Sequence, residues 1–190
     1  MMARRLLFLG PPGVGKGTQA QRLVGELGIP QISTGDMLRA AVAAGSEIGR
    51  RAKSFIDRGE LVPDQVVIGV AEARLAEHDA SAGFVLDGFP RTVAQAEALD
   101  RILERLGREL ELCVVMEVAE PALVERLLRR SKLEGRSDDN EETIRNRMRV
   151  YREQTEPLVA HYRRRGIVRE LDGLGSMDEV AERIRRAIAA

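Results

Sequence analysis

The chain alternates short apolar runs with longer segments in which apolar residues recur at helical spacing. Short apolar runs bounded by turn residues are typical of buried strands, and spacings of three and four residues are typical of helices. The predicted strands cover residues 4–9, 29–32, 83–87, 111–118 and 167–171. The predicted helices cover residues 15–27, 37–42, 48–56, 63–78, 92–106, 121–130, a long segment from about 140, and 177–188. This alternation predicts an α/β fold with a parallel, doubly wound, five-stranded sheet covered by helices on both faces.

Several helix starts are marked by local signals. Ser33, with Asp36 three residues later, resembles a capping box before the second helix. Pro63 is placed to open the helix that follows it. Asp139 and Glu142 fit an N-cap and its N3 partner for the long helix that begins near residue 140.

Composition and charge narrow the classes of function. A chain of 190 residues suits a single domain, here 1–190, with a substantial core. Its 30 basic and 30 acidic residues cancel, so no overall field favours nucleic acid or an anionic membrane, and we expect neither as a partner. Cys113 is the only cysteine and lies in an apolar run, which predicts a buried thiol and excludes an internal disulfide.

Basic residues before an apolar run at the start of the chain faintly resemble a signal peptide. The apolar run, Leu6–Leu9, is too short for one and leads directly into a glycine-rich loop. Nothing elsewhere approaches the length of a transmembrane helix. We therefore expect a cytoplasmic protein.

The glycine-rich loop, residues 10–18 (GPPGVGKGT), lies between the first predicted strand and the first helix. Glycines let such a loop turn its N–H groups inward, and Lys16 and the helix start add positive charge, which suits the phosphates of a nucleoside triphosphate. Gly17 stands where the general pattern has Ser or Thr, and the hydroxyl arrives one place later at Thr18. This departure weakens the case for a loop hydroxyl on Mg²⁺. A simple strand-to-helix turn is the alternative.

Asp87 ends the third predicted strand, at the edge where open parallel sheets bind their ligands. In a phosphate-loop protein an acid there serves Mg²⁺, directly or through water; an ordinary strand-end aspartate is the alternative. Gly88 would let the backbone approach a ligand, and Pro90 would stiffen the turn that carries Arg91.

Arginines come from several separate segments of the chain. Arg126 and Arg130 lie four residues apart, hence on one helical face. Singly, each arginine is typical of a solvated surface, but together they indicate a site for anions. His78 and His161 are isolated, and no Ser–His or His–carboxylate constellation is found.

Three stretches, residues 10–18, 33–39 (STGDMLR) and 87–92 (DGFPRT), resemble the signature stretches of adenylate kinases. Residues 135–140, followed by Arg147, resemble the family's lid and its return helix, and the resemblance extends from residue 4 to about residue 180. It implies a P-loop three-layer α/β/α fold with a helical NMP-binding insertion at 33–62 and a lid at 131–141. Only SKLEG separates Arg130 from Arg136, so the resemblance is to the short-lid form, without a zinc site.

The resemblance also implies site residues, position by position. The AMP site would comprise Thr34, Arg39, Glu60, Leu61, Val62, Gly88, Phe89, Pro90, Arg91, Gln95, Arg136 and Arg147. The ATP site would comprise Gly13, Val14, Gly15, Lys16, Gly17, Thr18, Arg126 and Gly175. The catalytic set would be Lys16, Arg91, Arg130, Arg136 and Arg147, with Asp138 and Asp139 ordering the closed lid. Asp87 would serve Mg²⁺ through water.

The implied activity is a reversible, Mg²⁺-dependent phosphoryl transfer from ATP to AMP that yields ADP. The attacking phosphate oxygen is already anionic, so the reaction needs no general base; it needs two polyanions to be positioned and neutralised, and water to be excluded by closing lobes. Thr34 and Gln95 favour adenine in this resemblance. A UMP or CMP kinase, and a nucleotide-binding switch without phosphoryl transfer, are the alternatives. A site completed within one chain makes a monomer the expected state.

Overall fold

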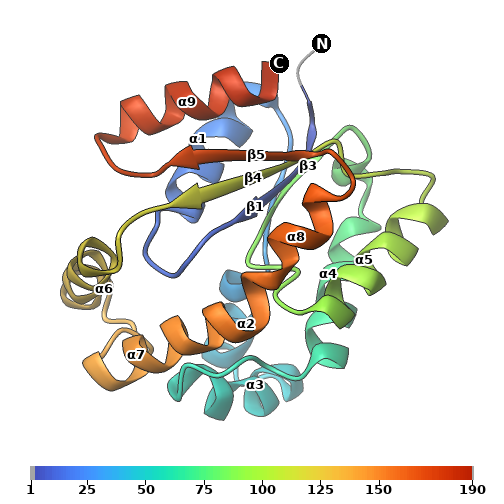
Figure 1. Ribbon diagram of the computed structural model, residues 1–190. Helices are drawn as coiled ribbons and strands as arrows, with labels where there is room; N and C mark the ends of the chain where they lie inside the picture. The colour runs from blue at the N-terminus through green and yellow to red at the C-terminus, as the bar shows by residue number, and fades with distance from the viewer. Residues whose placement is uncertain (1–2, 190) are drawn as a thin grey trace.

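The computed structural model describes residues 3–189, which contain a five-stranded parallel sheet (Figure 1). The strands are β1 (Arg5–Leu9), β2 (Gln31–Ser33), β3 (Phe84–Asp87), β4 (Leu112–Glu117) and β5 (Val168–Asp172). Their order is β2-β3-β1-β4-β5, and all pairs are parallel, which confirms the predicted α/β class. Residues 1, 2 and 190 of the predicted 1–190 domain lie outside the described residues.

Helices cover both faces of the sheet and its carboxyl edge (Figure 1). The helices along the sheet are α1 (Lys16–Leu27), α4 (Asp64–Leu75), α5 (Val93–Arg105), α8 (Pro157–Arg163) and α9 (Met177–Ala189). Those beyond its carboxyl edge are α2 (Thr34–Ala43), α3 (Glu47–Asp57), α6 (Glu120–Glu134) and α7 (Glu141–Val150). Two short turns complete the fold, the 3₁₀ turn η1 (His78–Ser81) and the π turn η2 (Tyr151–Thr155). No helix within residues 3–189 has the length and apolar content needed to cross a membrane.

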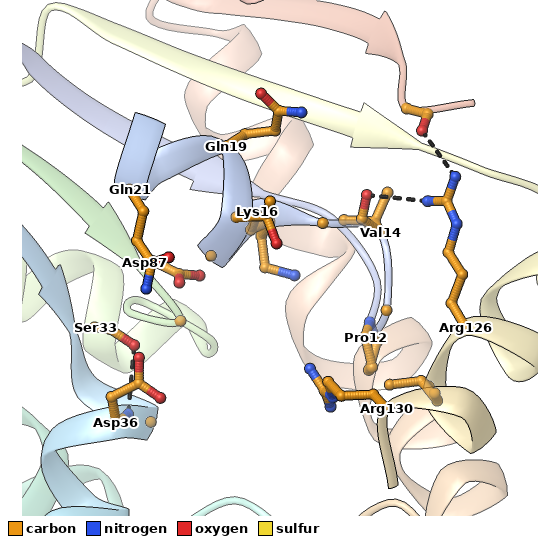
Figure 2. A pocket seen from close by; sticks show the side chains of 18 of the residues that line it. Pro12, Val14, Lys16, Gln19, Gln21, Ser33, Asp36, Asp87, Arg126 and Arg130 are labelled. Atoms are coloured by element: carbon orange, nitrogen blue, oxygen red, sulfur yellow. Dashed lines mark hydrogen bonds between the residues drawn. The ribbon is translucent and has the colours of Figure 1, made fainter. Parts of the chain in front are cut away.

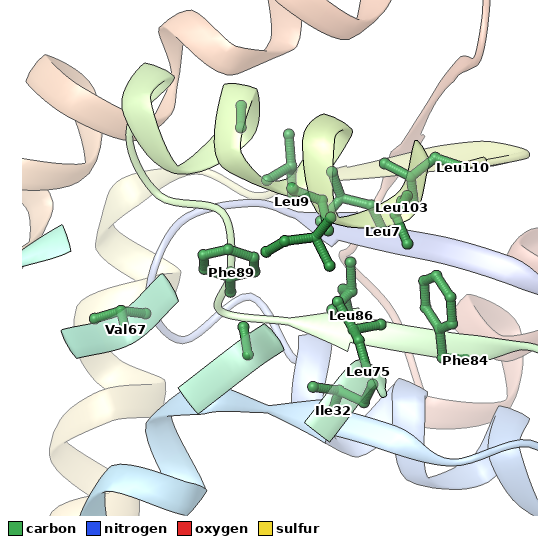
Figure 3. Close-up of a cluster of buried hydrophobic side chains, with 14 of the residues drawn as sticks. Leu7, Leu9, Ile32, Val67, Leu75, Phe84, Leu86, Phe89, Leu103 and Leu110 are labelled. Carbon is green, nitrogen blue, oxygen red and sulfur yellow. The ribbon is translucent and has the colours of Figure 1, made fainter. Parts of the chain in front are cut away.

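Side chains of β1 alternate between two hydrophobic clusters. Leu7 and Leu9 belong to the cluster formed with α4, α5 and α8, which Figure 3 shows with Leu86 of β3 among its members. Leu6 and Phe8 belong to the cluster formed with α1, α6 and α9. The four β1 side chains are 0–3% exposed, and burial of each stabilises the fold by roughly 1.5–3 kcal/mol. The loops that follow β1 and β3 therefore emerge side by side from a rigid sheet.

Helix α4 ends earlier than the predicted residue 78. Arg108 donates hydrogen bonds from its guanidinium to the carbonyl oxygens of Leu75 (2.9 Å) and Ala80 (3.2 Å). These bonds satisfy a terminal helix carbonyl that would otherwise need a continuing turn. The α-helix is followed by η1. The hydrophobic pattern of the segment could not predict this end, because it does not include the contact with Arg108.

The start of α7 corrects the predicted cap. Asn140, and not Asp139, is the N-cap, since its Oδ1 accepts from the Thr143 N–H at 3.0 Å. Both oxygens of Asp139 are instead engaged by Arg130 and Arg147. The predicted long helix is also interrupted: Pro157 has no N–H to continue the ladder, and the π turn η2 precedes it.

Candidate active site

A cavity of about 480 Å³ lies at the carboxyl edge of the sheet, between the glycine-rich loop, the end of β3 and helix α6. Figure 2 shows side chains from all three regions around it, including Lys16, Asp87 and Arg130. This "main cavity" is polar and open at the topological position where parallel sheets bind ligands.

The glycine-rich loop has the conformation expected of a phosphate cradle. Gly13 and Gly15 have φ values of 83° and 102°, which favour glycine. A Cβ on Gly13 would also lie 2.9 Å from Cγ of Leu127, so the loop packs against α6. Gly15 is the N-cap of α1 and has no side-chain acceptor to offer the first-turn N–H groups, which suits them to an anion.

Lys16 folds over this loop, donating from Nζ to the carbonyl oxygens of Gly10 (2.7 Å) and Pro11 (3.1 Å). Burial lowers its pKa to about 8; the carboxylate of Asp87 opposes this shift, and the charge of Arg91 adds to it. An anion near Nζ would favour the charged form of Lys16 against both burial and the repulsion from Arg91, so this position suits a phosphate group.

Six arginines also line the main cavity, and four of them come from separate segments around its centre: Arg91, Arg130, Arg136 and Arg147. Burial lowers the pKa of Arg91, and it lowers the pKa of Arg147 to about 10. Burial works against the charge of Arg130 as well, but the hydrogen bonds to Asp139 together with the charges of nearby carboxylates outweigh burial and raise its pKa. Several cations held close together in a buried site repel one another and lose hydration. Such an arrangement is typical of a site that binds a polyanion.

Asp139 fixes two of these cations. Its side chain is fully buried; Oδ2 accepts from Nε of Arg130 at 2.6 Å and Oδ1 accepts from Nη1 of Arg147 at 2.5 Å. Asp138 adds a 3.1 Å contact to Arg147 and a 4.0 Å contact to Arg39. Neither acid lines the main cavity, and each acts on it through the arginines it contacts.

Asp87 lies beside Lys16 and accepts a hydrogen bond from Nε2 of Gln31 at 3.2 Å. A Cβ on Gly17 would lie 3.4 Å from Oδ2 of Asp87, which is an ordinary van der Waals distance. The Asp87 carboxylate therefore faces the position where the general loop pattern has Ser or Thr. Within residues 3–189, no group of three or more His, Cys, Asp or Glu side chains is arranged to hold a metal.

A second, smaller hollow of about 60 Å³, the "side chamber", adjoins the main cavity. Arg39, Arg91, Arg147 and Gly88 line both spaces, so cations stand at the junction. Apolar side chains of Leu38, Ile56, Val62 and Val67 also line the side chamber. A ligand with an anionic end and a flat apolar end matches this distribution.

The structure brings most of the predicted site residues to these two spaces. The main cavity is lined by Gly13, Val14, Gly15, Lys16, Gly17, Thr18, Asp87, Arg91, Arg126, Arg130, Arg136, Arg147 and Gly175. The side chamber is lined by Thr34, Arg39, Glu60, Leu61, Val62, Gly88, Arg91, Gln95, Asp138 and Arg147. Arg126 also ties the loop to the last strand, donating to the carbonyl oxygens of Val14 and Gly173 at 3.3 Å each (Figure 2).

Three predicted AMP-site residues lie elsewhere than in the side chamber. Phe89 is fully buried in the hydrophobic cluster of α4, α5 and α8. Pro90 lines a third cavity of about 70 Å³, together with Tyr151 and Thr155. Arg136 lines the main cavity and is held by Glu134, whose Oε2 accepts from its Nε at 2.6 Å.

Several lining residues were missed by reasoning from the sequence. The main cavity also contains Gln19, and its Nε2 donates to the carbonyl of Met177 at 3.0 Å, joining α1 to the start of α9. Gln19 is 4% exposed although the neighbouring buried positions of α1 are apolar. A glutamine at a core-facing helical position, three residues after Lys16, is the signal that could have identified it.

A phosphate loop at the edge of a parallel sheet, with cations from several segments between two adjoining cavities, defines a phosphoryl-transfer enzyme of the nucleoside monophosphate kinase class. A family model described as "Adenylate kinase" matches residues 8–167. Proteins named adenylate kinase are similar throughout: one from Thermus thermophilus is 54% identical over 98% of each chain, and one from Xanthomonas euvesicatoria is 53% identical over 97% of this chain and 98% of its own. One from Leptospira biflexa is 54% identical over 97% of this chain and 100% of its own. The chain belongs to the adenylate kinase family and is a phosphotransferase.

Proposed function

We propose that this enzyme transfers the γ-phosphoryl group of ATP to AMP, reversibly, giving two molecules of ADP. The observation that carries the proposal is the shared wall of cations: Arg39, Arg91 and Arg147 line both cavities. ATP would place its phosphates along the glycine-rich loop in the main cavity, and AMP would enter the side chamber. The two phosphate groups that react would then meet at the junction.

In this arrangement an oxygen of the AMP phosphate forms a bond to the γ-phosphorus as the bond to the β,γ-bridging oxygen breaks. Charge moves toward the bridging oxygen, and Lys16 and the cluster of Arg91, Arg130 and Arg147 would neutralise it in place. No proton must leave the nucleophile, in keeping with the lack of a histidine–carboxylate pair among the described lining residues.

Mg²⁺ fits this site as a companion of the nucleotide. A single carboxylate, Asp87, lies beside Lys16 and keeps one oxygen clear of its bond from Gln31. Mg²⁺ usually keeps several waters and binds substrate phosphates with only one or two carboxylates. Asp87 would hold the hydrated ion, which supplies additional neutralisation of the phosphates.

The remaining assignments belong to the same proposal. Thr34, Gln95 and the backbone of residues 60–62 would surround the adenine end of AMP, and Arg126 and Gly175 the base end of ATP. Residues 33–62 would form a mobile NMP-binding lobe and residues 131–141 a short lid, of which 131–134 are the last turn of α6. A monomeric state, cytoplasmic location and the absence of zinc, nucleic-acid and membrane binding stay predictions from the sequence.

The test is ADP formation from Mg–ATP with AMP, GMP, CMP and UMP offered in turn. Rapid turnover largely confined to AMP is the expected result. Preference for a pyrimidine monophosphate would keep the mechanism and change the substrate. Hydrolysis alone, or no turnover with any acceptor, would instead indicate a nucleotide-driven switch.

Two substitutions probe the phosphate site directly. Lys16→Ala and Arg91→Ala should each lower kcat by roughly 10³-fold, as expected for cations that act on the transferred group. Circular dichroism should show an unchanged fold, and Arg101→Ala, on the exposed side of α5, serves as the control. Near-normal turnover of both site variants would show that the phosphate site is misplaced.

A further inference from the structure

The side-chain amide of Gln95 is held at both ends by partners of opposite kind. Its Oε1 accepts from the backbone N–H of Arg91 at 2.7 Å. Its Nε2 donates to Oδ1 of Asp64 at 2.8 Å. Gln95 is 1% exposed, so both bonds are shielded from water.

These partners fix which way the amide faces. A backbone N–H can only donate, and a carboxylate can only accept, so a turned amide would place two donors together at one end and two acceptors at the other. Thr92 closes the network: its Oγ1 donates to Asp64 at 3.1 Å and accepts from the backbone N–H of Gln95 at 3.2 Å. Asp64, the first residue of α4, is therefore the group that holds the amino end of Gln95.

This amide belongs to the wall of the side chamber, where cations and apolar side chains are both present. A monophosphate would bring its phosphate to the cations, which leaves its base for the apolar part of the chamber. Each end of the Gln95 amide retains one hydrogen-bonding position, a second lone pair on Oε1 and a second N–H on Nε2. Those positions are available to read the edge of a base.

We propose that Asp64 is a positioning residue that makes the site choose adenine over 6-oxopurines, an inference that rests on the proposed function. Adenine offers an exocyclic N–H donor beside a ring nitrogen acceptor. Hypoxanthine and guanine offer the reverse, an exocyclic oxygen beside a ring N–H. An amide that turns freely serves either base, whereas the Gln95 amide, held by Asp64, serves only one and leaves the other with unpaired polar groups.

Asp64→Asn tests this at nearly constant shape, because asparagine offers Gln95 either a carbonyl or an amino group and so leaves the Arg91 N–H as the remaining restraint on the direction of the amide. We expect kcat/KM for AMP divided by kcat/KM for IMP to fall by about tenfold. The change should appear in the KM values, and kcat for AMP should stay within about threefold of the parent enzyme. IMP is the probe because it differs from AMP only at this base edge. Asp64→Ala, which removes the carboxylate outright, should lower the ratio similarly.

Glu72→Gln, an exposed acid on the same helix that pairs with Arg105, is the matched control and should leave the ratio unchanged. Dissociation constants of AMP and IMP measured without ATP should shift as the KM values do. Equal losses for AMP and IMP, or a ratio within twofold of the parent enzyme, would overturn the role of Asp64. Failure of the parent enzyme to make ADP from AMP would instead overturn the proposed function.

Discussion

Lys16 is the residue whose environment says most about how the site works. Its amino group lies against two loop carbonyls, and burial together with the neighbouring arginines lowers its pKa to about 8. In the unfolded chain the same group would titrate near 10.5. Between these values the unfolded state binds more protons than the folded state, so the contribution of Lys16 makes the free energy of unfolding rise with pH in that window.

Nucleotide affinity should show the opposite trend. In the proposed site the protonated form of Lys16 binds phosphate, and in the free enzyme that form is lost as the pH rises through about 8. Isothermal calorimetry with ATP should therefore find this contribution to affinity falling by about tenfold between pH 7 and pH 9. Lys16→Ala should bind weakly at both values, and subtracting its pH dependence removes the ionisation of ATP itself. Parallel pH profiles for the two proteins would contradict the assignment.

At this scale the sequence predicted which residues line the main cavity better than it predicted their partners. Motif positions such as Lys16 and Asp87 line that cavity, because a short motif determines where its own residues lie. Asp139 was expected to be a helix cap, since its spacing to Glu142 fits one as well as Asn140 fits Thr143. Asp139 is not the cap because it is bound by Arg130 and Arg147, which lie 9 and 8 residues away in sequence. A capping pattern does not take such distant charges into account.

Elements were predictable in kind and order, and less so at their ends. Strands β1, β3 and β4 follow from apolar runs, and the cap of α2 follows from Ser33, whose Oγ accepts from the Asp36 N–H at 3.3 Å. The early end of α4 depends on Arg108, and the π turn depends on Pro157 within an otherwise helical segment. The first depends on a tertiary hydrogen bond and the second on the missing N–H of proline. A hydrophobic pattern read over many residues does not register either of them.

The π turn has a consequence for the site. It brings Thr155, which is 6% exposed, close enough for its Oγ1 to donate to the backbone carbonyl of Arg91 at 2.8 Å. The N–H of Arg91 is already bound to Gln95 at 2.7 Å. The backbone of this cation is thus held from both sides.

Thr155→Val should release one side of that hold while keeping the side-chain shape. An unpaired buried carbonyl costs about 1–3 kcal/mol, so the free energy of unfolding measured in urea should fall by about that amount. With Arg91 less well placed, kcat should also fall severalfold. Thr155→Ser keeps the donor and should retain kcat; identical kinetics of the Val and Ser variants would argue against this role of the π turn.

On the scale of the whole molecule, the end of α3 is joined to the region that begins α7. Ser137 donates from Oγ to Oδ1 of Asp57 at 2.9 Å, and Asn146 donates from Nδ2 to the carbonyl of Arg58 at 2.7 Å. Gly59 makes this approach possible, because a Cβ there would lie 2.8 Å from side-chain atoms of both Thr143 and Arg147. The two segments proposed to close over the nucleotides therefore contact each other directly.

If these bonds help to hold the closed form, removing them should open the free enzyme. Each exposed bond stabilises the closed form by about 0.5–1 kcal/mol, so the double variant Ser137→Ala with Asn146→Ala should lower the equilibrium constant for closure by about fivefold to thirtyfold. Fluorescence energy transfer between dyes on α3 and α6 should report the opening, and KM for AMP should rise by a similar factor. Arg145→Ala, on the exposed side of α7, is the control.

A bisubstrate analogue that spans both cavities should close parent and double variant alike, because its phosphates would meet Arg39, Arg91 and Arg147, which line both cavities, and these contacts would outweigh the two missing bonds. The kcat of the double variant should then equal or exceed that of the parent, since opening to release ADP becomes easier. A crystal structure with the analogue bound and residues 33–62 and 131–141 apart would contradict the coupling of closure to catalysis. A double variant with unchanged energy transfer and KM would contradict only the contribution of these two bonds, because the arginines would then hold the segments together without them.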